Sequence, residues 1–238
     1  MNKRHVLIIG ASSGLGYECM RWFSKNYNVT GLSRRGLIPD DINKEFALGL
    51  ACDANNLGLL RSSLEAAVAH FGKISVIVVA SGIQKIKPVR SFKPEEVLDL
   101  LSTNIMLPFN VASLFASQKF CESNAVLCLV SSISATKPEP GIVLYGATKA
   151  AVESLVSGLA KELAPRRVVG VSPGWLDTPM TQKYSHIYDN SFIGKIKELS
   201  PLGMIGITDV VHAIDFMVSE NAAKITGQVM IVDAGASL

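Results

Sequence analysis

The sequence has little of what marks a nucleic-acid binder or a membrane protein. Its 238 residues include 23 basic and 20 acidic ones, and the net charge of +3 gives no strong basic excess. No run approaches the roughly 18 apolar residues of a membrane span, and the apolar run near the start is too short for a signal peptide. We therefore expect neither nucleic acid nor membrane as a partner.

Cysteine and histidine are too few and too scattered to indicate a metal site. The four cysteines, Cys19, Cys52, Cys121 and Cys128, show no CxxC or other metal-binding spacing, and they lie within apolar segments. Buried free thiols are typical of a reducing compartment, so we expect a cytoplasmic protein. The four histidines are dispersed, and we predict no metal ligands.

Apolar segments alternate with helix-period segments along the whole chain. VLII, VIVV and VLCLV are continuous, which is typical of strands covered on both faces. Alternating strands and helices predict an α/β fold: a Rossmann-type doubly wound parallel sheet of about seven strands, in a single domain over 1–238. We expect strands at 5–9, 28–32, 46–52, 74–80, 125–130, 167–171 and 228–232. Helices are expected at 15–25, 55–71, 94–121 with a kink near Pro108, 145–163 and 209–219.

In such a sheet, ligands bind at the carboxyl ends of the strands, and a glycine-rich segment follows the first strand. In GASSGLG, Gly10, Gly14 and Gly16 allow a tight turn and a close approach of the backbone to a pyrophosphate. The next helix offers its N-terminal amides to the same phosphates. An ordinary strand-to-helix turn is the alternative, because glycines are common there without any ligand.

The end of the second strand indicates which dinucleotide would bind. An acidic residue often stands here and binds the ribose hydroxyls, whereas this chain has Ser33, Arg34 and Arg35. A guanidinium grips a 2′-phosphate that an acid would repel, so we predict NADP(H) as the cofactor. The alternative is a pair of solvated loop arginines.

Polar residues suited to proton transfer follow the fifth strand. Ser132 precedes Tyr145, and Tyr145 and Lys149 are four residues apart on one face of the next helix. We expect the Lys149 ammonium to lower the pKa of Tyr145, so that the phenol exchanges a proton near neutral pH. Ser132 would hold the substrate oxygen, and Asn104 a water that links Lys149 to solvent. Each residue also has an ordinary structural alternative, such as a snorkelling surface lysine.

Together these motifs resemble the short-chain dehydrogenase/reductase family over nearly the whole chain. Gly10-x-x-x-Gly14-x-Gly16, Asn104, Ser132 and Tyr145-x-x-x-Lys149 match the family's glycine motif and catalytic residues in order and spacing. SPGWLDTPM resembles the segment that meets the nicotinamide, and the stretch from SPLGMIG to IVDAG is similar to the 3-oxoacyl-[acyl-carrier-protein] reductase branch. The full set of expected cofactor contacts is Gly10, Ser12, Ser13, Gly14, Leu15, Gly16, Ser33, Arg34, Arg35, Asp53, Ala54, Ala80, Ser81, Gly82, Tyr145, Lys149, Pro173, Gly174, Leu176 and Thr178.

The chain also departs from the family pattern. Ile9 stands for the usual threonine, and Val79, Ala80, Ser81 and Gly82 stand for Asn-Asn-Ala-Gly. FASQKFCESNAV is shorter and less basic than carrier-protein reductases show before the fifth strand, which argues against acyl carrier protein as the partner.

The resemblance implies an NADP(H)-dependent oxidoreductase that reduces a ketone to a secondary alcohol. Tyr145 would donate the proton, Ser132 would hold the oxygen, Lys149 would bind the ribose and lower the Tyr145 pKa, and Asn104 would serve the proton relay. The alternative is a non-catalytic NADP(H)-binding regulator or scaffold.

Three further expectations concern the substrate and assembly. Residues 177–205 contain aromatic and polar side chains and would form a lid over the substrate, with an ordinary surface excursion as the alternative. Lys85, Lys87, Arg90 and Lys93 follow the fourth strand without an acid among them and predict an anionic carbonyl substrate, such as a 3-oxoacyl thioester, unless they are merely solvated. Surplus apolar residues on helix 145–163 predict a homotetramer or homodimer.

Overall fold

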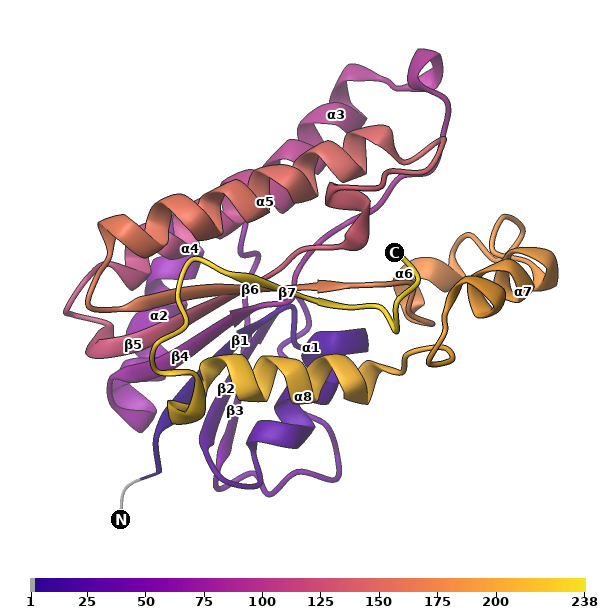
Figure 1. Ribbon diagram of the computed structural model, residues 1–238. Helices are drawn as coiled ribbons and strands as arrows, with labels where there is room; N and C mark the ends of the chain where they lie inside the picture. The colour runs from indigo at the N-terminus through magenta and orange to yellow at the C-terminus, as the bar shows by residue number, and fades with distance from the viewer. Residues whose placement is uncertain (1–2) are drawn as a thin grey trace.

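The computed structural model describes residues 3–238, and a seven-stranded parallel sheet forms its central layer (Figure 1). The strand order is β3-β2-β1-β4-β5-β6-β7. The strands are β1 His5–Ile9, β2 Asn28–Ser33, β3 Ala47–Ala51, β4 Ile74–Val79, β5 Cys121–Val130, β6 Arg167–Pro173 and β7 Val229–Val232. The predicted fold class is confirmed, and the order reverses between β1 and β4, where such sheets bind ligands.

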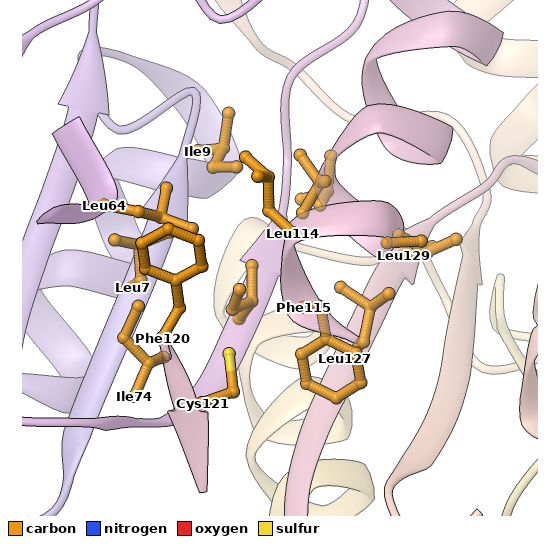
Figure 2. Close-up of a cluster of buried hydrophobic side chains, with 14 of the residues drawn as sticks. Leu7, Ile9, Leu64, Ile74, Leu114, Phe115, Phe120, Cys121, Leu127 and Leu129 are labelled. Atoms are coloured by element: carbon orange, nitrogen blue, oxygen red, sulfur yellow. The ribbon is translucent and has the colours of Figure 1, made fainter. Parts of the chain in front are cut away.

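Helices cover both faces of the sheet, as the continuous apolar strands require. On one side lie α1 Gly14–Phe23 and α8 Ile207–Val218; on the other lie α2 Leu57–Phe71, α4 Leu107–Phe115 and α5 Val143–Glu162 (Figure 1). α3 Pro94–Leu101 continues into α4 and packs along α5. Figure 2 shows side chains of the α2–α4–α5 core, including Phe115 and Phe120. All four cysteines are free and buried, as predicted.

The central helix differs from its prediction at the middle and at the end. A π-helical turn, Ser102–Met106, separates α3 from α4, because Pro108 lacks the N–H that would bond the Asn104 carbonyl four residues earlier. The predicted end at 121 is wrong, since Cys121 already pairs with Ile74 as the start of β5.

The stretch Pro94–Phe115 is long and apolar enough to span a membrane by length and composition alone. Much of its apolar surface instead packs inside the protein: Leu100, Leu107, Val111, Ala112, Leu114 and Phe115 are buried.

Two other expectations need correction. Residues 177–205, where no helix was expected, contain α6 Pro179–Gln182 and α7 Asn190–Leu199, the latter capped by the Asp189 carboxylate, which accepts a hydrogen bond from the Phe192 N–H. The supposed surplus apolar residues of α5 are used within the protein itself. Val152, Val156 and Leu159 are buried in the core, and Leu155 and Leu163 pack at its margin.

Candidate active site

The turn after β1 has no room for side chains at two glycines. Gly10 has φ +91°, and a Cβ there would lie 2.8 Å from the backbone nitrogen of Ser81. A Cβ at Gly16 would collide with the Gly10 carbonyl. A Cβ at Gly14 would only make ordinary contact with the Thr178 side chain at 3.7 Å, but the φ of +54° there favours glycine. These glycines therefore bring the β1 turn, the end of β4 and the segment after β6 together.

The same turn leads into the N-terminus of α1. Ser13 is the N-cap with an extended backbone, and its side chain makes no capping hydrogen bond; Leu15 is buried behind it. The first amides of the helix are thus not capped by their own serine, which suits an anion at this position. Ser12 presents its carbonyl to the Arg35 guanidinium at 2.9 Å.

Arg35 and Arg34 are exposed at the end of β2. Through Ser12, Arg35 connects this end to the glycine turn, while the Ser33 hydroxyl accepts the Gly36 N–H at 3.0 Å. Two cations therefore stand beside the turn, and nothing acidic follows β2 before Asp40. This arrangement fits a phosphorylated ribose better than a bare one.

The ends of β3 and β4 contribute the next part of the edge. Asp53 follows β3 and accepts the Asn55 N–H, with Ala54 between them. After β4, the Ala80 N–H donates to the Ile9 carbonyl at 2.9 Å, which fixes Ser81 against Gly10.

Tyr145 and Lys149 lie in the first turns of α5, above the end of β5. Tyr145 is only 9% exposed and Lys149 only 5%. The Lys149 Nζ donates to the Val130 carbonyl at 2.9 Å and lies 5.7 Å from the centre of the Tyr145 ring. Ser132 follows β5 as the N-cap of a 3₁₀ turn, Ile133–Ala135, and its hydroxyl is close enough to the phenol to act on the Tyr145 pKa. A buried phenol, a buried ammonium and a hydroxyl therefore converge.

Burial moves the two ionisable groups in opposite directions. Desolvation raises the pKa of Tyr145 to about 12, which outweighs the opposing hydrogen bond with Ser132. Desolvation lowers the pKa of Lys149 to about 8. The expected lowering of the Tyr145 pKa is therefore not found, because loss of water around the phenol dominates and only the Ser132 hydroxyl opposes it.

Asn104 lies beside this group but its side chain is already engaged. Its Oδ1 accepts the Ile83 N–H at 2.9 Å, and its Nδ2 donates to the Ile83 carbonyl at 2.9 Å and to the Thr148 hydroxyl at 3.0 Å. The asparagine thus joins the β4 loop to α5. A Cβ on Gly82 would lie 3.4 Å from the Lys149 Nζ and 3.5 Å from the Asn104 Oδ1, so only a glycine leaves this space open.

The segment after β6 completes the site. Pro173 ends β6, the Gly174 N–H donates to the Val232 carbonyl at 2.9 Å, Leu176 is buried, and Thr178 is the N-cap of α6. The sequence reasoning missed two neighbours, Trp175 and Gln84. Trp175 stands within SPGWLDTPM and packs edge-on against Tyr188, and Gln84, two residues after Gly82, donates from Nε2 to the Tyr188 hydroxyl at 3.0 Å.

The basic loop after β4 is less cationic than its sequence indicates. Glu96, from the first turn of α3, pairs with Lys87 at 2.8 Å and with Lys85 at 3.6 Å. Its carboxylate also accepts the Lys93 N–H at 3.0 Å. The absence of an acid among residues 84–93 is thus offset by one from the next helix.

A family model described as enoyl-(acyl carrier protein) reductase matches residues 10–237. The 3-oxoacyl-[acyl-carrier-protein] reductase FabG of Thermotoga maritima is 30% identical, with 96% of each chain covered. The chain belongs to the short-chain dehydrogenase/reductase family. It is an oxidoreductase of this family, as the sequence motifs predict.

Two solved structures have the same fold over almost the entire chain. The 3-ketoacyl-(acyl-carrier-protein) reductase from Brucella melitensis, complexed with NADH, is 27% identical with a TM-score of 0.84, covering 99% of this chain and 98% of that one. ElxO with NADP bound is 26% identical with a TM-score of 0.87, covering 98% of both chains.

Proposed function

We propose that this protein is an NADPH-dependent reductase that converts a ketone into a secondary alcohol. The observation that carries the proposal is the convergence of a buried phenol, a buried ammonium and a serine hydroxyl at the carboxyl edge of the sheet. The glycine turn without room for side chains supports cofactor binding at the same edge. Relatives with NADH and with NADP bound are both known, so the preference for NADPH rests on Arg34 and Arg35.

The cofactor contacts that we propose run along this edge. Gly10, Ser12, Ser13, Gly14, Leu15 and Gly16 would hold the pyrophosphate; Ser33, Arg34, Arg35, Asp53 and Ala54 the adenosine half; Ala80, Ser81, Gly82, Pro173, Gly174, Leu176 and Thr178 the nicotinamide half. When bound, the reduced nicotinamide supplies the hydride that the carbonyl carbon receives.

The protein's own residues supply the proton. The Tyr145 phenol donates its proton to the carbonyl oxygen as negative charge develops there, and the Ser132 hydroxyl holds that oxygen by a hydrogen bond. The Lys149 ammonium stabilises the phenolate that remains. Since the Asn104 side chain is engaged, we assign its part in the proton relay to its backbone carbonyl, to which Pro108 cannot donate.

Replacing Tyr145 with phenylalanine tests the proposal. The variant keeps the ring and its packing but has no proton to give, so turnover should fall by a factor of about 10²–10⁴ while NADPH still binds. NADPH oxidation would be measured against a panel of ketones, and NADPH binding by calorimetry. Tyr27→Phe is the matched control, because that phenol packs on Phe23 away from the site. A Tyr145→Phe protein as active as the wild type would refute the mechanism, and an inactive wild type that binds NADPH would favour a regulator.

We also propose that the protein self-associates. Leu98, Met106 and Phe109, on the outer side of α3 and α4, are each more than half exposed, and Val143 at the start of α5 is 48% exposed. Exposed apolar groups on adjacent helices favour pairing with a second copy about a two-fold axis.

A further inference from the structure

The 177–205 segment presents different chemistry on its two sides. Tyr184, Tyr188, Phe192 and Ile196 recur every four residues and are half-buried. Lys183, Lys195 and Lys197 are exposed. The lysines of this segment therefore face solvent, and its other side is aromatic.

Three aromatic rings form a cluster on this inward side. Tyr188 and Phe192 are 4.7 Å apart between ring centres, and Trp175 meets them edge-on at 6.1 Å and 6.3 Å. Trp175 comes two residues after the end of β6, the strand that pairs with β5, and Ser132 follows β5. The cluster therefore begins at the same sheet edge as the proposed proton donor.

Gln84 fixes the cluster over the site. Its Nε2 donates to the Tyr188 hydroxyl and its backbone carbonyl accepts from the Tyr184 hydroxyl, both at 3.0 Å. The preceding residue, Ile83, has its N–H and carbonyl held by Asn104. The Tyr188 phenol is also close enough to Tyr145 to contribute to its raised pKa.

This wall is uncharged. The rings of Trp175, Tyr188 and Phe192 carry no charge, and Lys85 and Lys87, which follow Gln84 in the chain, share the single carboxylate of Glu96. Against these three rings a substrate anion would lose its water without an ion pair in compensation, whereas an aromatic ring would pack against other rings.

The wall also contains one polar atom without a partner. Within residues 3–238, the Trp175 Nε1 is buried and has no hydrogen-bond acceptor. Buried donors are normally paired, so an acceptor supplied by a bound molecule would be favourable here.

We propose that Trp175, Tyr188 and Phe192 select an uncharged aromatic or alicyclic ketone that carries a second oxygen as hydrogen-bond acceptor for the Trp175 indole. This inference rests on the proposed function and replaces the anionic substrate expected from sequence. It assigns the choice of substrate to three rings that were not among the predicted site residues.

A matched pair of substrates tests the charge. The methyl ester of para-acetylbenzoic acid and the free para-acetylbenzoate share a skeleton and differ in charge. We expect kcat/KM with NADPH to be about tenfold or more higher for the ester, since a buried charge without a partner is strongly disfavoured. A carboxylate, or acetoacetyl coenzyme A, reduced as efficiently as the ester would overturn the proposal.

Variants test the residues. Trp175→Phe should lower kcat/KM for the ester by about tenfold and change that for acetophenone, which has no second acceptor, much less. Lys195→Ala with Lys197→Ala is the control on the outer side of α7 and should leave the ester-to-carboxylate ratio unchanged. Equal losses for both ketones with Trp175→Phe, or a control that alters the ratio, would count against the proposal.

Binding separates this inference from the proposed function. The chain has two tryptophans, so Trp22→Phe, on α1, leaves Trp175 as the only tryptophan, whose emission can be excited selectively at the red edge of absorption. With NADP⁺ present, the ester should change Trp175 emission at lower concentration than the carboxylate does. If no ketone is reduced, the reductase assignment fails, while this difference in binding still supports or contradicts the selectivity of the wall.

Discussion

Replacing Lys149 with methionine should stabilise the protein while removing its activity. The folded protein lowers the pKa of Lys149 from its ordinary value of 10.5 to about 8. Each pH unit is worth about 1.4 kcal/mol, so keeping this ammonium charged at neutral pH costs about 3 kcal/mol of stability. Methionine has a similar length and no charge, but it loses the hydrogen bond to the Val130 carbonyl, worth about 1–1.5 kcal/mol. The net gain near pH 7 is then about 1–2 kcal/mol, or roughly 2–8 °C in Tm.

The pH dependence identifies the cause. The pKa of Lys149 is lower in the folded protein than in the unfolded chain, so the cost is fully present below about pH 8. Between about pH 8 and 10.5 the folded protein has lost this proton while the unfolded chain still holds it, and the cost is progressively relieved. The advantage of Lys149→Met should therefore shrink between about pH 7 and about pH 10 and then reverse, since the Val130 bond is still missing.

Urea unfolding of the cofactor-free protein across this range measures the effect. The measurements stop at about pH 10 because of Tyr145. Above its ordinary pKa of 10.0 the phenol ionises in the unfolded chain but not in the folded protein, which then loses stability for a separate reason. Lys161→Met, at an exposed lysine of the same helix, is the control and should show no such pH dependence. A wild-type-to-variant difference that stays constant from about pH 7 to about pH 10 would refute the reasoning.

The other predictions address cofactor, assembly and the 177–205 segment. Arg34→Asp should lower kcat/KM for NADPH relative to NADH by about tenfold or more, since a charge-assisted bond to the 2′-phosphate is exchanged for repulsion; equal use of both cofactors by the wild type would contradict this. Phe109→Asp should yield a monomer by light scattering at micromolar concentration, whereas the wild type should be a dimer or tetramer; a monomeric wild type would be the contrary result. Gln84→Leu removes the side-chain hydrogen bond to Tyr188 and keeps the backbone bond to Tyr184, so amide hydrogen exchange across residues 177–199 should accelerate while exchange in α5 does not. Unchanged exchange would show that Gln84 does not hold this segment in place.

The sheet could be predicted from sequence because its strands are covered on both faces. Continuous apolar runs such as VLII and VIVV have few alternatives in a chain of this composition. α7 was missed although Asp189, the N-cap, is followed by Phe192, Ile193 and Ile196 at helical spacing. The helical spacing of these apolar residues was overlooked because Lys195 and Lys197 stand among them.

The charges of the site could not be predicted in the same way. Glu96 offsets part of the charge of Lys85 and Lys87 because the first turn of α3 lies beside the loop after β4, and no local sequence pattern predicts that placement. The hydrogen bonds of the Asn104 side chain likewise depend on Ile83 and Thr148, which come from two other parts of the chain. Residue types at the site were therefore predictable, whereas their partners were not.

The opposite effects of burial on Tyr145 and Lys149 determine which group limits the reaction at high pH. In water the phenol, with a pKa of 10.0, loses its proton slightly before the ammonium, with a pKa of 10.5. In the folded protein this order is reversed: the pKa of Lys149 is about 8 and that of Tyr145 about 12. The first proton lost is then the one on the cation that stabilises the phenolate. Because kcat/KM for NADPH reports on the cofactor-free enzyme, a decline that begins near pH 8 belongs to Lys149, although Tyr145 is the group that donates the proton.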